Sequence, residues 1–235
     1  MYEEHPTFEL NKSINKPIWK YMDFWKFLNL LDTSCLYFSE SENLGDNFEG
    51  RIPKAVLKLM LEEDERLDRN SNKELNGFIE NTLRKETLIS SWTYHQKESF
   101  AMWKMYAKNK MGLAIKTNLD SLKNSFKQSD RSIYIGEVRY FDESKFRYNT
   151  SNLYYPFLVK LEYYSFEEEI RCITSCREEE PKEGKLVEVD LNELIRIIYI
   201  SPNSKPEFKK MLELLRREYN LNFKIEFSEV NDSWL

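Results

Sequence analysis

The stretch Phe166-Glu167-Glu168-Glu169-Ile170-Arg171-Cys172-Ile173 joins strand-like alternation to four charged side chains. In an extended strand, successive side chains point to opposite faces, so Glu167 and Glu169 would share one face with Arg171. Two carboxylates beside a guanidinium suit the binding of a polar substrate and the stabilisation of charge in a transition state. The same pattern also fits a solvated edge strand with a surface salt bridge, and the residues alone leave both interpretations open.

Segments on either side of this stretch predict a single α+β domain. Apolar periodicity indicates strands at 17–21, 35–39, 87–92, 113–116, 132–140, 166–174, 186–189, 195–200 and 223–227, with a turn possible at the start of the sixth. It indicates helices from Asp23 to Leu31, two within 53–86, and others at 99–107, 118–126 and 205–219. The segment 154–161 fits either type. Strands and helices do not alternate regularly, which favours a mixed, mostly antiparallel sheet with flanking helices over a doubly wound sheet.

Composition bounds the class of protein. The chain has 235 residues, of which 41% are hydrophobic, and a net charge of −5, so a buried core is expected and no global basic signature points to nucleic acid. We divide it into a polar N-terminal leader, 1–16, and one domain, 17–235. The leader has no apolar signal core and no stretch reaches the roughly 20 apolar residues of a membrane span, so we expect a cytoplasmic protein without a membrane partner.

Metal and redox chemistry receive little support from the sequence. The three cysteines Cys35, Cys172 and Cys176 are an odd number, and two histidines do not complete a zinc motif. We therefore expect reduced, mostly buried thiols and no metal. His95 has no evident partner in the sequence.

Two further segments hold candidate binding residues. Ser90, Ser91 and Thr93 place small hydroxyls along a strand. Trp103 and Tyr106 recur at helical spacing, which is typical of core packing, although the polar tip of Tyr106 could also reach a ligand.

Four of these segments resemble a bacterial family known as domain of unknown function 2971. The resemblance rests on Leu36-Tyr37-Phe38-Ser39, Gly45-Asp46-Asn47-Phe48-Glu49-Gly50, Met102-Trp103-Lys104-Met105-Tyr106-Ala107 with Gly112, and the Glu-x-Glu-x-Arg stretch at 167–171. It covers about residues 17–200. Asn47 and Phe166 depart from the proline and tyrosine common in that family.

The order of segments is also similar to that of ADP-ribosyltransferases. That resemblance implies an NAD-using enzyme in which Lys20 or Tyr21 lies on the first strand, Ser90, Ser91 and Thr93 on a second, and Glu167 and Glu169 on a third. Glu169 would be the principal catalytic residue, Glu167 its helper, and Arg171 an orienting partner or a phosphate contact, while Trp103 and Tyr106 would lie beside the cofactor. Lys20 departs from the usual Arg or His. The implied role is a toxin or phage-defence effector that modifies protein or nucleic acid, with an antitoxin or defence-system partner.

Two alternatives remain open. In a metal-dependent nuclease or hydrolase, Asp46, Glu49, Glu167 and Glu169 would supply oxygen ligands for Mg²⁺. In a non-enzymatic interaction module, Glu167, Glu169 and Arg171 would form a buried structural ion network.

Overall fold

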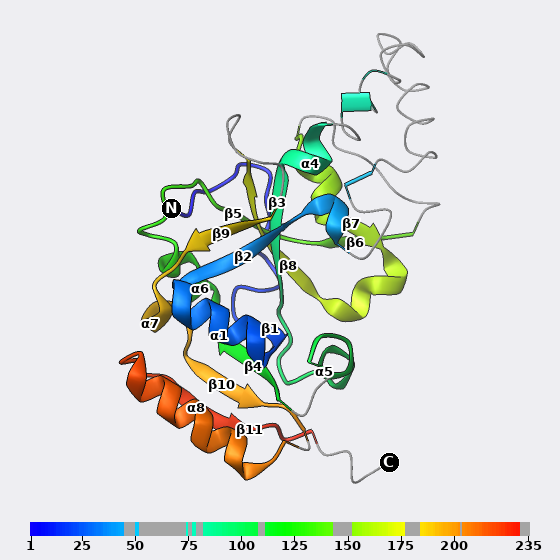
Figure 1. Ribbon diagram of the computed structural model, residues 1–235. Helices are drawn as coiled ribbons and strands as arrows, with labels where there is room; N and C mark the ends of the chain where they lie inside the picture. The colour runs from blue at the N-terminus through cyan, green and yellow to red at the C-terminus, as the bar shows by residue number, and fades with distance from the viewer. Residues whose placement is uncertain are drawn as a thin grey trace.

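The computed structural model describes residues 1–44, 50–51, 74, 77–78, 82–107, 111–142, 152–176, 184–202 and 204–230. Within these residues nine strands form one mixed, mostly antiparallel sheet with helices packed around it, so the fold is α+β, as predicted (Figure 1). No helix in this part of the chain has the length and apolar character needed to cross a membrane.

The large sheet has a branched order. Its strands are β1 (Ile18–Asp23), β2 (Cys35–Glu40), β3 (Thr87–Thr93), β4 (Gly112–Thr117), β5 (Tyr134–Glu137), β8 (Glu169–Ser175), β9 (Lys185–Glu188), β10 (Ile197–Ile200) and β11 (Lys224–Phe227). The main order is β11-β10-β4-β1-β3-β2-β9, and β3 also pairs with β8, which pairs with β5. Only β10 and β11 pair in parallel within this sheet. The strands β6 (Arg139–Phe141) and β7 (Val159–Leu161) form a separate parallel pair.

The branch point is β3, and it opens a gap in the sheet. On one edge β3 pairs with β8 over its whole length, from Thr87 opposite Ser175 to Thr93 opposite Glu169. On the other edge, β1 meets β3 at Thr93, and β2 meets it at Leu88 and Ile89. The described strands leave positions 90–92 without a pairing partner on that edge, so β1 and β2 diverge there.

The described helices are α1 (Phe24–Thr33), α4 (Arg84–Glu86), α5 (Phe100–Tyr106), α6 (Leu119–Ser125), α7 (Leu191–Leu194) and α8 (Pro206–Glu218), with 3₁₀ turns η1 (Ser41–Asn43), η3 (Tyr155–Leu158) and η4 (Glu162–Glu167). Four of them, α1, α5, α6 and α7, begin after a residue whose side chain caps them. The carboxylate of Asp23 accepts a hydrogen bond from the backbone N–H of Lys26 at 2.9 Å, which satisfies one free donor at the start of α1, as predicted.

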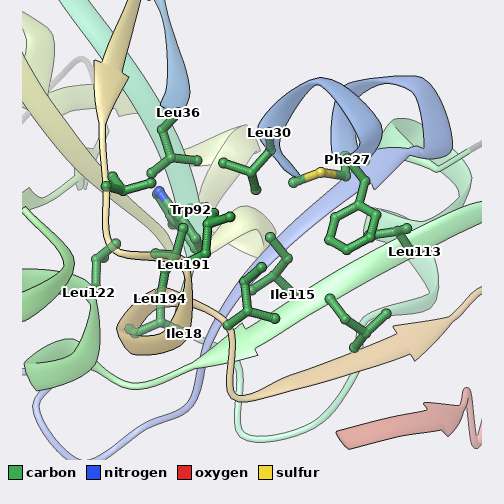
Figure 2. Packing of buried hydrophobic residues seen from close by; sticks show 14 of the residues in the cluster. Ile18, Phe27, Leu30, Leu36, Trp92, Leu113, Ile115, Leu122, Leu191 and Leu194 are labelled. Carbon is green, nitrogen blue, oxygen red and sulfur yellow. The ribbon is translucent and has the colours of Figure 1, made fainter. Parts of the chain in front are cut away.

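The alternation of β1 divides the core between two faces of the sheet. Ile18 and Met22 pack in the main cluster with Phe27 of α1 (Figure 2). Trp19 and Tyr21 point to the opposite face and pack with α5. By the same alternation, Lys20 starts on the face of Ile18 and Met22.

Several segments differ from the sequence-based prediction. The single strand expected at 132–140 is two strands, β5 and β6, which pair with different partners. The ambiguous segment 154–161 becomes η3 followed by β7, and α7 was not predicted. The helices predicted within 53–86 lie largely outside the described residues. Residues 1–16 have no regular element but lie along β5, where the Glu137 carboxylate accepts 2.7 Å hydrogen bonds from the N–H and hydroxyl of Ser13.

Candidate functional site

A pocket of about 790 Å³ occupies the gap beside β3. Its polar lining includes Lys20, Ser90, Ser91, Thr93, Lys160, Glu167 and Glu169, and its aromatic lining is Trp19, Tyr21, Trp25, Tyr37, Trp92, Tyr106 and Tyr164. Segments remote in sequence therefore share one cavity, and its mix of apolar walls with a few convergent polar groups is typical of small-molecule sites.

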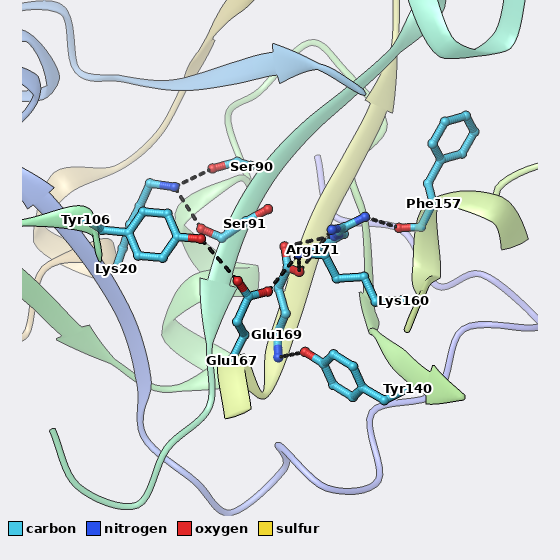
Figure 3. A network of polar contacts seen from close by, with 10 residues as sticks. All are labelled: Lys20, Ser90, Ser91, Tyr106, Tyr140, Phe157, Lys160, Glu167, Glu169 and Arg171. Carbon is cyan, nitrogen blue, oxygen red and sulfur yellow. Dashed lines mark hydrogen bonds and ion pairs between the residues drawn. The ribbon is translucent and has the colours of Figure 1, made fainter. Parts of the chain in front are cut away.

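Glu169 lies in a buried network of four charges. Arg171 binds its carboxylate with two 2.9 Å contacts, from Nε to Oε1 and from Nη2 to Oε2. Lys160 Nζ lies 3.2 Å from Oε2 of Glu169 and 2.7 Å from Oε2 of Glu167 (Figure 3). We call these four residues the ion network. All are more than nine-tenths buried, so the solvated salt bridge considered from the sequence is wrong.

Neighbouring groups hold the ion network in place. Arg171 Nη1 donates to the carbonyl of Phe157 at 2.7 Å. The hydroxyl of Tyr106 donates to Oε1 of Glu167 at 3.3 Å, and that of Tyr140 accepts from the backbone N–H of Glu169 at 2.8 Å. Each carboxylate thus has a fixed orientation before any ligand arrives.

The electrostatics keep Glu169 ionised. Burial would raise the pKa of Glu169, but the charges of Arg171 and Lys160 and hydrogen bonds from Arg171 and Ser91 outweigh burial and lower it to about 2. Burial, together with the charge of Glu167, raises the pKa of Tyr106, so its phenol stays protonated and donates. A permanent carboxylate therefore faces the pocket.

A turn replaces the first part of the strand expected at 166–174. Glu167 ends η4, and Glu168 takes a left-handed conformation with φ of 40° before β8 begins at Glu169. Glu168 points away from the ion network and contacts His95 Nδ1 at 2.9 Å and Lys16 Nζ at 3.1 Å. Glu167 and Glu169 therefore meet through Lys160 and not through strand alternation.

Lys20 reaches into the pocket through the gap in the sheet. Its Nζ donates to Oγ of Ser90 at 3.0 Å and to the carbonyl of Ser91 at 2.9 Å (Figure 3). Burial is the largest influence on the pKa of Lys20 and lowers it to about 8. The unpaired edge of β3 thus binds a lysine where a neighbouring strand would otherwise lie.

The other predicted residues have divided roles. Tyr21 and Tyr106 line the pocket, whereas Trp103 is buried behind it and donates its indole N–H to Glu98 at 2.9 Å. Thr93 lines the pocket, and its buried hydroxyl has no hydrogen-bond partner among the described residues. Tyr21 accepts a hydrogen bond from the backbone N–H of Ser99 at 2.9 Å.

Sequence reasoning missed Lys160, the cation shared by Glu167 and Glu169. It lies on β7 in the segment that fitted either element type, and its neighbours Val159 and Leu161 carry no charge that would draw attention to it. A lone lysine in an apolar strand was the available signal, because lysine is seldom buried without a partner.

The sequence also led to predictions about metal ligands and about the cysteines. Asp46 and Glu49 lie outside the described residues, and within those residues no three His, Cys, Asp or Glu side chains are grouped to hold a metal ion. None of the three cysteines forms a disulfide. Cys172 is buried opposite Ser90 in the β3–β8 pair, whereas Cys35 and Cys176 are half-buried, so the prediction of mostly buried thiols is wrong for two of the three. Burial raises the pKa of Cys172 to about 12, although Lys20 acts against this, so the thiol stays protonated at neutral pH.

No protein-family model matches the chain, and no curated protein matches it. The family resemblance drawn from its motifs therefore stays a prediction.

Proposed function

We propose that the pocket binds NAD and that the protein is an ADP-ribosyltransferase-like enzyme. One observation carries the proposal: a single cavity is lined by Lys20 and Tyr21 of β1, by Ser90, Ser91 and Thr93 of β3, by Glu167 at the end of η4 and by Glu169 at the start of β8. The resemblance to ADP-ribosyltransferases requires these segments to converge. Their strands pair directly, β1 with β3 and β3 with β8.

The lining suits the parts of a dinucleotide. Aromatic walls suit the planar nicotinamide and adenine rings, and the ammonium of Lys20 suits a pyrophosphate. The Thr93 hydroxyl, buried and without a partner in the described residues, is a polar group that a bound ribose could satisfy.

The proposed chemistry needs a fixed negative charge. As nicotinamide leaves with the electrons of its bond to ribose, positive charge develops on the sugar, and the ionised Glu169 would stabilise it. The acceptor then forms the new bond to the ribose carbon and loses its proton, for which Glu167, the second carboxylate that lines the pocket, would be the base. The acceptor is a protein or nucleic acid, and a role as toxin or phage-defence effector rests on the sequence resemblance alone.

Release of nicotinamide from labelled NAD tests the proposal. Glu169→Gln should lower the release rate by about 10²-fold or more, because a preorganised charge is lost. Glu168→Gln is the matched control: it neutralises the adjacent residue, which faces His95 and Lys16, and should leave release unchanged. Undiminished release by a folded Glu169→Gln variant would remove Glu169 from the mechanism, and the absence of release by the wild-type protein would contradict the function.

The variant Lys20→Met tests NAD binding separately, because it leaves the ion network unchanged. It should weaken NAD binding, measured by calorimetry, because the ammonium beside Ser90 and Ser91 is lost. Unchanged NAD affinity would place the phosphates elsewhere.

Burial of the ion network supports a second candidate, a structural role in an interaction module. Arg171 is 1% exposed and both its nitrogen contacts to Glu169 are short.

Glu169→Gln or Arg171→Met alone would leave a buried charge without its partner and should cost about 3–5 kcal/mol of unfolding free energy in urea denaturation. The double variant should cost much less than the sum of the two. Additive losses would show that the pair is not coupled; loss of turnover without loss of stability would favour the enzyme.

A further inference from the structure

Lys20 differs from the other two lysines that line the pocket. Lys160 belongs to the ion network, and the Nζ of Lys26 lies 3.8 Å from Oδ2 of Asp23. In the described part of the chain, no carboxylate forms an ion pair with Lys20, whose two hydrogen bonds go to uncharged oxygens. Its ammonium therefore lacks the direct stabilisation that a carboxylate gives to a buried positive charge.

The two hydrogen bonds of Lys20 suit a neutral amine as well as an ammonium (Figure 3). Nζ donates to Oγ of Ser90 at 3.0 Å and to the carbonyl of Ser91 at 2.9 Å. An ammonium has three N–H donors, whereas a neutral amine has two donors and one lone pair. Because the two oxygens accept both donors of the neutral amine, its lone pair takes the remaining position. Loss of one proton thus leaves a nucleophile that the edge of β3 already orients, on a side chain that lines the pocket.

The same edge of β3 offers a donor to the oxygen of a carbonyl group. In an antiparallel strand, the N–H and the C=O of one residue point to the same edge. The C=O of Ser91 points into the gap, where it accepts from Lys20, so the N–H of Ser91 points there as well. The described strands give Ser91 no pairing partner on that edge. An amine and an N–H donor side by side match the two ends of a C=O bond, because the amine attacks the carbon while the donor stabilises charge that develops on the oxygen.

Burial makes the neutral amine available near neutral pH. It is the largest influence on the pKa of Lys20 and lowers it from 10.5 to about 8; of the groups around it, Cys172 and Glu169 raise the pKa and Lys26 lowers it. At pH 7 about one Lys20 side chain in ten is then neutral, against about one in 3,000 at the ordinary value. Lysines desolvated in apolar pockets are those that proteins use as nucleophiles toward carbonyl compounds.

We infer that Lys20 captures an aldehyde or ketone in the pocket as a covalent imine. The amine nitrogen forms a bond to the carbonyl carbon, and the carbonyl oxygen leaves as water with the two protons of the neutral amine, so the step needs no oxidant or reductant. The ring of Trp92, whose centroid lies 5.3 Å from Nζ, favours a carbonyl group attached to a planar ring. This activity goes beyond the proposed function and needs no NAD.

Trapping with borohydride detects the imine directly. The wild-type protein is incubated with benzaldehyde for a fixed time and then treated with sodium borohydride, which reduces the imine to a stable benzylamine, and peptide mass spectrometry locates the benzyl group. We expect Lys20 to carry at least about tenfold more label than Lys26 or Lys160, because more of its amine is neutral. Its label should rise from about pH 7 to about pH 9 and then level off, as its amine loses the last of its protons.

Matched variants assign the label to the pocket. Lys20→Met should remove the strong label. Lys116→Met is the control: Lys116 is half-buried on β4 and its Nζ lies 4.9 Å from the ring centroid of Trp19, but it does not line the pocket, so labelling of Lys20 should be unchanged. Unfolding the wild type in urea should reduce the label on Lys20 to that of the other lysines, which tests the role of the fold without any variant.

Three outcomes would overturn the inference. Equal labelling of Lys20 and Lys26 in the folded protein would show that the amine is not activated. A strong label that persists in folded Lys20→Met would belong to another lysine, and a preference for Lys20 that survives in urea would arise from local sequence and not from the pocket. Absence of nicotinamide release changes none of these measurements, so failure of the proposed function is detected separately.

Discussion

Lys20 is the residue whose position depends most on the gap in the sheet. Its side chain starts on the face of Ile18 and Met22, yet its ammonium reaches the edge of β3 at Ser90 and Ser91. Had β1 continued along β3 beyond Thr93, backbone pairing would occupy that edge. This edge of β3 therefore lacks a few backbone hydrogen bonds of the sheet, and the ammonium of Lys20 takes their place in the pocket.

The lowered pKa of Lys20 predicts a pH dependence of stability. Its pKa falls from 10.5 to about 8 on folding, so between these values the unfolded chain binds more protons and the Lys20 contribution to the unfolding free energy rises with pH. Urea denaturation of the wild type and Lys20→Met should therefore differ between about pH 7 and about pH 10, with wild type gaining at most ~3 kcal/mol relative to the variant. A difference that stays constant with pH would contradict the shift.

The sequence predicted three of the four residues of the ion network, Glu167, Glu169 and Arg171. The reason given, that all three alternate along one strand, was only partly right. Glu169 and Arg171 do share a face of β8, as two residues two apart in a strand must. Glu167 joins them from a 3₁₀ turn, and Lys160 comes from a different strand. Periodicity cannot reveal such contacts, because Glu168 in the turn contacts His95 and Lys16, which are remote in sequence.

Among the elements, α1 has two functions: it covers the core with Phe27 and Leu30 and presents Trp25 at the pocket. Its start depends on the cap by Asp23, the last residue of β1. Asp23 therefore fixes the direction in which the chain leaves β1 and enters α1, beside the gap in the sheet.

We predict that Asp23→Ala lowers the unfolding free energy by about 1 kcal/mol, because a free N–H at the start of α1 loses its acceptor. Chemical denaturation measures the loss. Asp23→Ser keeps a side-chain acceptor and should recover most of it, while equal losses in both variants would indicate that the carboxylate acts by another route.

Elements with strong local signals were predicted well, and elements defined by distant partners were not. The cap and apolar spacing of α1 and the compact strand β2 needed only neighbouring residues. The division of 132–140 into β5 and β6 arises because Tyr134–Glu137 pairs with β8 whereas Arg139–Phe141 pairs with β7. Pairing partners are a property of the tertiary fold, which one strand's sequence does not contain.

For the whole molecule, the branched sheet explains why one cavity collects residues from so much of the chain. The strand β3 pairs with β1, β2 and β8, and each of the three brings its own side chains to the gap (Figure 1). The periodicity and order of the segments predicted the α+β class, but they do not predict that a sheet will branch. The pocket is therefore a product of topology, although most of its key residues were identifiable in advance.

Because β8 lies late in the chain, the site is completed late during synthesis. On a ribosome, β1, β2 and β3 are made first, but Glu169 and Arg171 follow Lys160 late in the order of translation. Pairing between β3 and β8 closes a loop of more than 70 residues, and contacts of such long range form slowly. Nascent chains shorter than about three quarters of the protein therefore lack the complete charged floor, and the pocket can form only in the last part of translation.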